Sequence, residues 1–390
     1  MMKKRYVALD VLRGLTVAFM CIVNNPGTWA HMYAPLRHAG WEGCSPTDLV
    51  YPFFIFCMGC AMAYSFAKYD GLTGASAWKV LKRGIAIFLV GLLLNLYPFF
   101  PTSSHEGMTF WQNFGRWLGH KRIFGVLQRI AGCYIVAGLV ILLAKKDTVK
   151  VFWSIIGLCA IYTGILIVFG NQPGPFTIEG NVSSRIDVAL VGSAHVYHGY
   201  SLPDGSAADF DPEGLLGALT GACTALLGFL AGSLIRKSTA GYAEPGLSVS
   251  EKESCSPIGI VARLFFFGCA CLAAGLVLSI RIPISKPLWS ASYVFYAGGW
   301  ALVALAVLAY MIDVKGHEKW FVPAKAMGMN ALMAFVLSGV IAKTLPLVGF
   351  SQAGIFGANE FTSFVFSLLF MLVIFCFQWF FYKKNIVIKL

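Results

Sequence analysis

The sequence predicts an all-α integral membrane protein, a bundle of about ten transmembrane helices with both termini on the cytoplasmic side. Of the 390 residues, 58% are hydrophobic and 12% are charged, which is about half the charged share of a soluble domain. The apolar runs are long and do not alternate, as at 85–96 and 261–280, whereas barrel strands would alternate every second residue. Because backbone groups in lipid must bond to one another, these runs indicate helices.

Windows of about 19 residues locate the candidate spans. They are expected at 6–24, 49–67, 84–100, 123–143, 151–169, 214–235, 259–279, 288–312, 326–345 and 361–382. The chain is therefore interpreted as one transmembrane domain over 1–390. Six helices lie in 6–235, a polar cytoplasmic loop follows at 236–258, and four helices lie in 259–382.

Local signals support several of these helices in chain order. Asp10 and Arg13 interrupt the first apolar run and no small-residue cleavage site follows, so the run is a span and not a signal peptide. The second helix opens near Asp48, after a helix-ending Asn-Asn-Pro-Gly sequence at 24–27. The sixth opens with Asp-Pro-Glu-Gly at 211–214, an order typical of a helix start, for which capping alone is a sufficient reason.

The distribution of basic residues gives the orientation. With the N-terminus inside, the predicted inner loops hold 18 Lys and Arg residues and the outer loops hold 7. Cytoplasmic loops are the ones enriched in these residues, and an even number of spans returns the chain to the same side. The bias therefore predicts that both termini face the cytoplasm.

Composition also excludes several classes of function. The net charge of +12 comes from residues at the ends of apolar runs, which is a topology signal and not a nucleic-acid surface. The 11 Cys residues are mostly inside apolar runs, and Cys57 and Cys60 are interpreted as packing residues. His195 and His198 lack a third ligand, so no metal site is expected.

Three long outer loops are expected at 25–48, 101–122 and 170–213, and they collect most of the histidines. Six of the seven histidines lie there: His31, His38, His105, His120, His195 and His198. Loop residues held by a rigid scaffold often carry function, so the outer face is a candidate functional surface. The alternative is that loops simply tolerate histidine.

Asp10 and Arg13 lie three residues apart on the first helix. A charge at membrane depth costs roughly 2.5–3.5 kcal/mol, so each of these residues needs a partner or a water-filled cavity. They either form an ion pair that fixes the helix or take part in ligand binding. Gly14, next to the guanidinium, permits close approach of a ligand or a helix.

The segment from Asn24 to Asp48 is the most informative part of the sequence. A helix ends after Asn24, a loop carries His38 and Trp41, and Asp48 opens the next helix. Asp48 has two possible roles. It can cap the helix, or it can orient His38 and raise its basicity. A buried Gln128-Arg129 step in the fourth span is costly without partners, so it is expected to line a cavity between helices.

At this point the chain resembles a known family, the heparan-α-glucosaminide N-acetyltransferases and their bacterial relatives in the transmembrane acyltransferase class. The resemblance covers essentially the whole chain in order. It is carried by Arg13-Gly14, Val23-Asn24, His38-Ala39-x-Trp41-x-Gly43, Asp48-Leu49-Val50-x-Pro52, Arg122-Ile123-x-Gly125-Val126-Leu127-Gln128-Arg129, Asp211-Pro212-Glu213-Gly214, Leu288-Trp289-Ser290-x-Ser292-Tyr293, Asp313-Val314-Lys315-Gly316 and Gly328-Met329-Asn330.

The resemblance implies transfer of an acetyl group from cytoplasmic acetyl-CoA to the amino group of a glucosamine-containing sugar on the outer side. His38 matches the family's active-site histidine and Asn24 a polar partner near it, and Asp48 is expected to complete the catalytic group. Trp41 and Glu42 are expected to contact the sugar. The residues expected to hold polyanionic acetyl-CoA are Arg13, Lys82, Arg83, Gln128, Arg129, Arg236 and Lys237.

Two mechanisms remain open, because His38 could act as a general base or accept the acetyl group as a nucleophile. Two other functions also remain open, a sugar transporter and an O-acetyltransferase of envelope polysaccharide. The expected partners are the amino sugar and the lipid bilayer, without nucleic acid, and a homo-oligomer is left open. The compact N-terminus favours a bacterial inner membrane over a lysosome.

Overall fold

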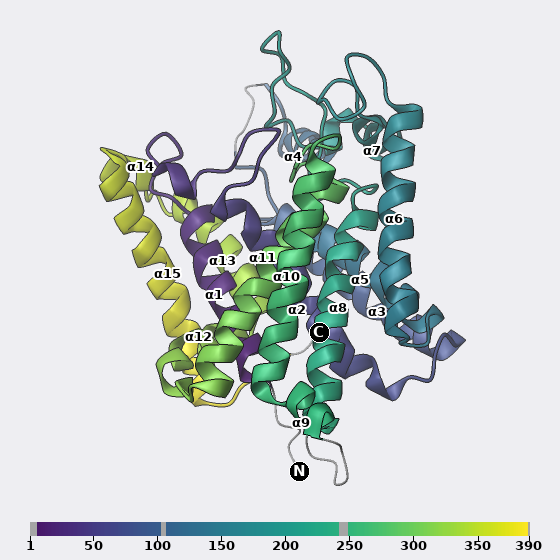
Figure 1. Ribbon diagram of the computed structural model, residues 1–390. Helices are drawn as coiled ribbons and strands as arrows, with labels where there is room; N and C mark the ends of the chain where they lie inside the picture. The colour runs from purple at the N-terminus through teal and green to yellow at the C-terminus, as the bar shows by residue number, and fades with distance from the viewer. Residues whose placement is uncertain (1–5, 103–106, 242–248, 389–390) are drawn as a thin grey trace.

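The computed structural model describes residues 6–102, 107–241 and 249–388, and in these ranges it is a bundle of helices (Figure 1). Apart from two isolated bridges, no β-structure forms in the described part of the chain. The long helices are α1 (Val7–Asn24), α2 (Val50–Ser65), α3 (Gly74–Leu96), α5 (Val126–Leu143), α6 (Thr148–Phe169), α8 (Ala218–Gly241), α10 (Pro257–Ser279), α11 (Ala291–Ala309), α13 (Ala331–Leu347) and α15 (Glu360–Lys383). The shorter helices are α4 (Phe110–Gly119), α7 (Val182–Val191), α9 (Val249–Cys255), α12 (Val322–Met329) and α14 (Gln352–Phe356).

The helical membrane bundle expected from the sequence is confirmed. In the described ranges, eight helices are long and apolar enough to cross a membrane, and α12 with α13, bent by 67° at a short break, would make a ninth. The predicted span at 84–100 corresponds to α3, which starts earlier and carries Lys79, Lys82 and Arg83 in its first turns. Because of those charges, α3 is not among the eight helices that are apolar enough to cross a membrane. Its length is nevertheless similar to that of its neighbours, and it packs on α5.

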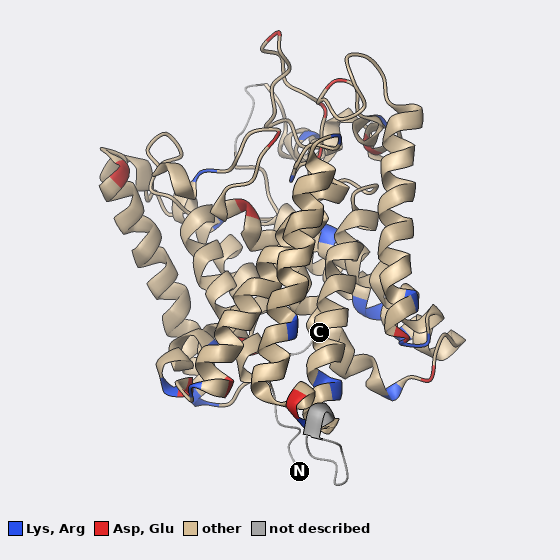
Figure 2. Ribbon diagram, in the orientation of Figure 1, with Lys and Arg blue, Asp and Glu red and all other residues tan. Residues whose placement is uncertain are grey.

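The long helices alternate in direction, so that both described ends of the chain lie toward the lower end of the bundle in Figure 1. The outer loops predicted from the sequence gather at the upper end, where they contain α4, α7 and α14. Many of the basic residues lie near the lower end, at the starts of α3 and α6 and the end of α8 (Figure 2). This asymmetry is the structural counterpart of the charge bias in the sequence.

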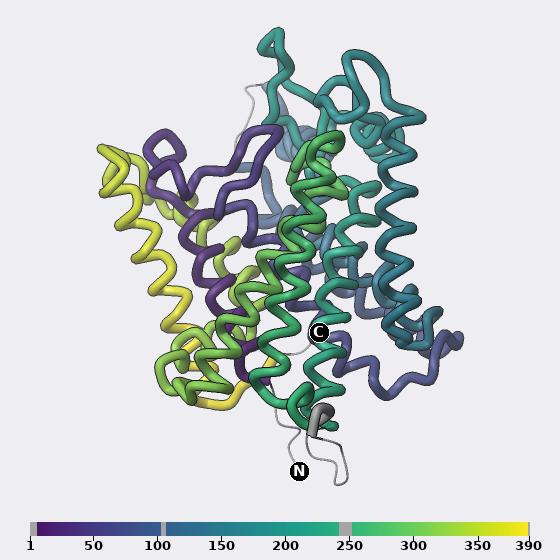
Figure 3. The backbone as a smooth tube through the Cα atoms, viewed as in Figure 1, coloured from purple at the N-terminus to yellow at the C-terminus, as the bar shows by residue number. Residues whose placement is uncertain are grey.

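Helix α8 forms the centre of the bundle (Figure 3). It is 83% buried over its apolar window, and it packs against α2, α5, α6 and α11. The peripheral helices α6, α10 and α15 are only 22–28% buried over theirs, and their exposed faces carry large apolar side chains such as Phe169, Phe266 and Phe380. A helix that exposes such a face is suited to lipid.

Two predicted elements differ in detail from the structure. The polar loop expected at 236–258 is partly helical, because α8 continues to Gly241 and α9 forms before α10; residues 242–248 lie outside the described residues. The span expected at 326–345 is broken at Asn330. There the Asn330 side chain donates to the carbonyl of Ile386 and accepts from the amide of Ile388, which ties the break to the C-terminal tail.

Small residues set the close approach of α2 and α8. A Cβ added at Gly59 would lie 1.8 Å from the carbonyl oxygen of Ala225, and one at Gly228 would lie 2.1 Å from that of Phe56. Both neighbours are backbone atoms, which cannot move without separating the helices. Small residues that bring backbones together are a common basis of helix association in lipid.

We expect Gly59→Leu to force α2 away from α8 and to destabilise the bundle by at least about 1–3 kcal/mol, as overpacked cores do. The measurement is the thermal unfolding midpoint of the protein in detergent. Gly157→Leu on α6 is the matched control, because an added Cβ there meets nothing within 4 Å. Equal midpoints for the two variants would contradict the role given to this contact.

Candidate active site

His38 and Asp48 are brought together at the upper end of the bundle. The loop after α1 folds back over the short 3-10 helix Pro46–Leu49 that leads into α2. The Nδ1 atom of His38 lies 2.7 Å from Oδ1 of Asp48. The second carboxylate oxygen accepts from the amides of Ala39 and Ser45, at 2.9 and 3.0 Å, and from the Ser45 hydroxyl at 2.9 Å. Asp48 therefore fills both roles left open by the sequence, as a cap and as the partner of His38.

The pair is buried on one side and open on the other. The Asp48 side chain is 1% exposed, whereas that of His38 is 40% exposed. A carboxylate held by fixed donors stays ionised and orients the imidazole that it contacts. The ring of His38 is thus anchored through Nδ1, and its other nitrogen, Nε2, is left for a ligand.

Lys286 is the third member of this group, and the sequence analysis did not single it out. Its Nζ lies 3.1 Å from Oδ1 of Asp48 and 3.0 Å from Nδ1 of His38. An ammonium cannot accept a hydrogen bond, so the consistent arrangement has Nδ1–H and Nζ–H both donating to Asp48. That tautomer leaves the lone pair of His38 on Nε2, where a base or nucleophile needs it.

Two adjoining cavities meet at His38. The outer cavity has a volume of about 360 Å³ and is lined by His38, Ala39, Asp48, Tyr51, Arg122, Tyr197, Gly199, Tyr200, Pro212, Glu213, Lys286, Pro287 and Trp289. The inner one, about 140 Å³, is lined by Met20, Asn24, His38, Thr47, Val50, Tyr51, Phe54, Val126, Ile130, Glu213, Lys286 and Phe335. Asn24, at the end of α1, therefore lines the same inner cavity as His38. The apolar lining of the inner cavity leads from the site into the bundle.

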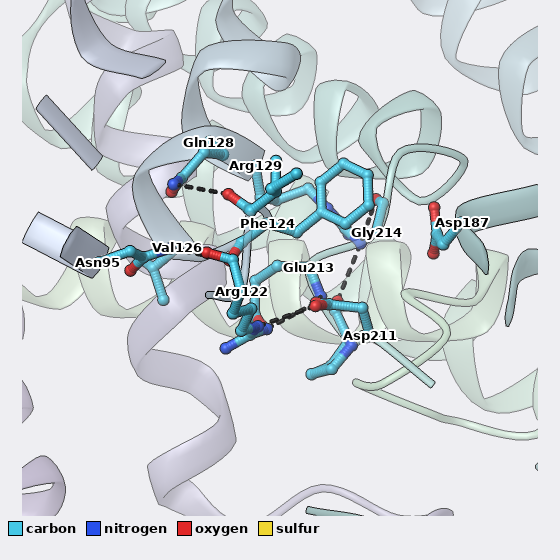
Figure 4. Close-up of polar contacts among 12 residues, drawn as sticks. Asn95, Arg122, Phe124, Val126, Gln128, Arg129, Asp187, Asp211, Glu213 and Gly214 are labelled. Atoms are coloured by element: carbon cyan, nitrogen blue, oxygen red, sulfur yellow. Dashed lines mark hydrogen bonds and ion pairs between the residues drawn. The ribbon is translucent and has the colours of Figure 1, made fainter. Parts of the chain in front are cut away.

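A network of ion pairs around Arg122 forms another wall of the outer cavity (Figure 4). Arg122 donates from Nε and Nη2 to the two oxygens of Asp211, at 2.8 and 2.6 Å, and Nη2 also pairs with Glu213. Burial alone would lower the pKa of Arg122, but its two carboxylate partners raise it above the ordinary value. Arg122 therefore stays charged and holds two carboxylates in place.

Arg129 lies directly behind this wall. Its Nη2 donates to the carbonyls of Pro212 and Gly214, at 2.9 Å each, and its guanidinium stacks over Trp289. Gln128 donates to the carbonyl of Ile123 at 2.9 Å. Both side chains are buried and point into the bundle and not into lipid. They hold the backbone beside the outer cavity, although neither is among the residues that line it.

The predicted sugar contacts at Trp41 and Glu42 lie away from the cavity. Trp41 donates to the carbonyl of Phe176 at 2.6 Å and packs edge-on against Tyr200 and Phe210. It therefore supports Tyr200, which does line the cavity. Glu42 is exposed on the loop. The aromatic rings facing the cavity are those of Tyr51, Tyr197, Tyr200 and Trp289, which the sequence analysis did not select.

The other described outer histidines do not reach His38 or the cavities. His120 contacts the carbonyl of Arg116, His195 that of Lys121, and His198 pairs with Asp209 at 3.1 Å. His31 is exposed, and His105 lies outside the described residues. Within the described ranges, no three His, Cys, Asp or Glu side chains are placed to share a metal ion.

The residues predicted to hold acetyl-CoA fall into two groups. Gln128 and Arg129 lie beside the outer cavity. Arg13, Lys82 and Arg83 lie in the first halves of α1 and α3, and Arg236 and Lys237 lie in the last turns of α8; these parts of the helices lie toward the lower half of the bundle in Figure 1. In that half Arg13 pairs with Asp10, and Tyr64 is within electrostatic range of Arg236. The Nε atoms of Arg13 and Arg236 are buried without a partner in the described structure. Lys82, Arg83 and Lys237 are exposed.

Comparison with known proteins agrees with the motifs. Residues 5–177 match the family model described as heparan-alpha-glucosaminide N-acetyltransferase, catalytic. The human protein named heparan-alpha-glucosaminide N-acetyltransferase is 27% identical over 396 residues, covering 88% of this chain and 54% of that protein. The mouse protein of the same name is 26% identical over 397 residues, with the same coverage. The chain thus spans about half the length of the curated relatives it matches. The resemblance expected from the sequence is confirmed.

Asp187, on α7, supports the ion-pair wall from outside and gives a testable dependence of stability on pH. It is fully buried, accepts from the amide of Leu215 at 2.9 Å, and has no partner for Oδ2 in the described structure. Burial raises its pKa to about 6, whereas an unfolded Asp titrates near about 3.9. The folded protein therefore binds this proton more tightly than the unfolded chain, and this group lowers stability as the pH rises from about 4 to about 6.

We expect Asp187→Asn to remove that loss, because the amide keeps an acceptor for Leu215 and carries no charge. Above about pH 6 the variant should be more stable than the original protein by up to about 2–3 kcal/mol, and near pH 4 the two should converge. The measurement is the thermal unfolding midpoint in detergent across this range. A constant difference at every pH would show that Asp187 does not titrate as described.

Proposed function

We propose that this relative of the heparan-alpha-glucosaminide N-acetyltransferases transfers an acetyl group from cytoplasmic acetyl-CoA to the amino group of a glucosamine-containing sugar on the opposite side of the membrane. One observation carries the proposal. The His38–Asp48 pair, in the region that matches the catalytic family model, lines a cavity of about 360 Å³. That volume suits the end of a sugar and not a whole polysaccharide.

The chemistry of amide formation explains the need for such a pair. An ammonium group is no nucleophile until it loses a proton, and a neutral imidazole takes that proton near neutral pH. In the direct route, Nε2 of His38 takes the proton, and the free amine attacks the thioester carbon. The carbon–sulfur bond then breaks, and the leaving thiolate takes the second proton from the nitrogen. The net products are an amide, a thiol and one proton.

The acetyl-histidine route uses the same atom. Nε2 attacks the thioester carbon, and CoA leaves as the thiolate, which takes a proton from the ammonium. The free amine then displaces imidazole from the acetyl group, and the freed Nε2 takes the second proton from the nitrogen. In both routes Asp48 holds Nδ1–H and stabilises the positive charge that develops on the ring. Asn24 lines the inner cavity beside His38, where its amide is available to the carbonyl of the acetyl group.

Acetyl-CoA has two parts that need different surroundings. Its nucleotide is polyanionic and suits cations, and Arg236 and Arg13 each carry a buried, unpartnered Nε in the lower half of the bundle. Its pantetheine arm is long and weakly polar, and the inner cavity beside His38 is lined mainly by apolar side chains from α1, α2, α5 and α13. With the cytoplasm at the basic end, the donor would enter from below and meet the acceptor at His38.

The direct test is to supply the purified protein with acetyl-CoA and glucosamine. We expect equimolar free CoA and N-acetylglucosamine. Absence of CoA release with every amino sugar tried would exclude acetyl transfer. Release only with sugars that lack an amino group would instead identify an O-acetyltransferase.

His38→Ala should lower kcat by about 10²–10⁴-fold or more, the usual contribution of a general base or nucleophile. Acetyl-CoA binding, measured directly on the same protein, should be retained. His198→Ala is the matched control, because that histidine pairs with Asp209 outside both cavities, and it should keep most of the turnover. Substantial turnover by purified His38→Ala would remove His38 from the chemistry.

A further inference from the structure

The charged groups around the outer cavity are paired with one another. Lys286 pairs with Asp48 at 3.1 Å. Arg122 makes a two-point ion pair with Asp211, and one of the same nitrogens is shared with Glu213. Three carboxylates therefore share these two cations. A third cation, Arg129, lies behind the same wall and donates to the carbonyls on either side of Glu213, so Glu213 is distinguished by its access to the cavity and not by an excess of charge.

Glu213 is the most accessible of these three carboxylates. The side chains of Asp48 and Asp211 are 1% and 0% exposed, whereas that of Glu213 is 13% exposed. The oxygens of Asp48 and Asp211 already accept hydrogen bonds from fixed donors. Glu213 also lines both the outer and the inner cavity together with His38. It is therefore the acidic side chain that a ligand placed at Nε2 of His38 can still reach.

The position of Glu213 is fixed by its surroundings. Its amide donates to Oδ1 of Asp211 at 2.9 Å, and the carbonyl of the preceding Pro212 accepts from Arg129 at 2.9 Å. The side chain is held by Arg122. A binding group that is held in place before the ligand arrives loses little entropy on binding.

Resting on the function proposed above, we propose that Glu213 binds the acceptor's amino group and makes this cavity select cationic amino sugars over neutral and acidic ones. The acceptor nitrogen is positively charged when it arrives, and it becomes positively charged again once it has bonded to the thioester carbon. A fixed carboxylate favours both species, so it does not simply stabilise the ground state. The same carboxylate repels a sugar that bears a carboxylate or a phosphate.

A purely structural role would not need this carboxylate. Asp211 already gives Arg122 a bidentate partner, which is the strongest geometry for a guanidinium. The carboxylate of Glu213, which also lines the cavity, can therefore take an ammonium ligand as a second partner.

The test is Glu213→Gln, which keeps the size of the side chain and an oxygen for Arg122 but removes the charge. We expect KM for glucosamine to rise about 10- to 100-fold, as for loss of a charge-assisted hydrogen bond. KM for acetyl-CoA should stay within about twofold. Glu179→Gln is the matched control, since that carboxylate is exposed on an outer loop and does not line the cavity.

Binding is measured alongside turnover, as competition by glucosamine or by glucose against radiolabelled glucosamine at near-neutral pH. The original protein should prefer glucosamine, and Glu213→Gln should bind both sugars alike. Failure of the original protein to transfer acetyl groups would refute the proposed function, while this preference would still test Glu213. An unchanged preference for glucosamine in Glu213→Gln would overturn the inference. A fall in kcat or in the unfolding midpoint would not rescue it, because that fall would reflect only the loss of support for Arg122.

Discussion

The structure around the candidate site depends on the burial of one carboxylate, that of Asp48, at the start of α2. A buried, ionised carboxylate is costly unless several donors surround it. Here Oδ2 accepts from two amides and a hydroxyl, and Oδ1 accepts from His38 and Lys286. The position at a helix N-terminus favours the negative charge further. The hydrogen bonds that this carboxylate requires fix the loop of His38 and bring Lys286 over α2.

Contacts around Asp48 also connect helices that are distant in the sequence. The backbone carbonyl of Asp48 accepts from the hydroxyl of Tyr293 on α11, at 2.7 Å. The loop before α11 is held from the other side, because the amide of Gly43 donates to the carbonyl of Ile284 at 2.7 Å. The loop that carries His38 is thereby held by contacts with two other parts of the bundle. A second network, centred on Arg122 and Arg129, does the same for another wall of the outer cavity and leaves the space between them for a ligand.

Much of this arrangement could be predicted from the sequence. The parts that could not be predicted have one physical reason in common. Helices that span lipid appear in the sequence as unbroken apolar runs, so the bundle and its loops were predictable. His38 and Asp48 are ten residues apart, close enough for local sequence to suggest their contact. Lys286 lies 238 residues from Asp48, and only the packing of α11 against α2 brings it there. Nothing in its own neighbourhood separates it from other loop cations.

Similar reasoning explains the remaining differences. Trp41 was the obvious aromatic side chain in its loop, but its indole N–H is used by Phe176, so Tyr200 and Tyr197 face the cavity instead. Gln128 and Arg129 are buried in the bundle, because lipid would not tolerate them, but neither lines the two cavities at His38. The end of the bundle at which they lie depends on where α5 begins relative to the cavity. A sequence motif alone does not give the depth of a residue in the bundle.

The central claim is that donor and acceptor reach one histidine from opposite sides of the membrane, and it can be tested with sealed vesicles that contain the purified protein. Acetyl-CoA is enclosed inside and labelled glucosamine is supplied only outside, so that only molecules in one orientation can act. The account predicts that N-acetylglucosamine accumulates outside while free CoA accumulates inside. Product that forms only when both substrates are on the same side would contradict it.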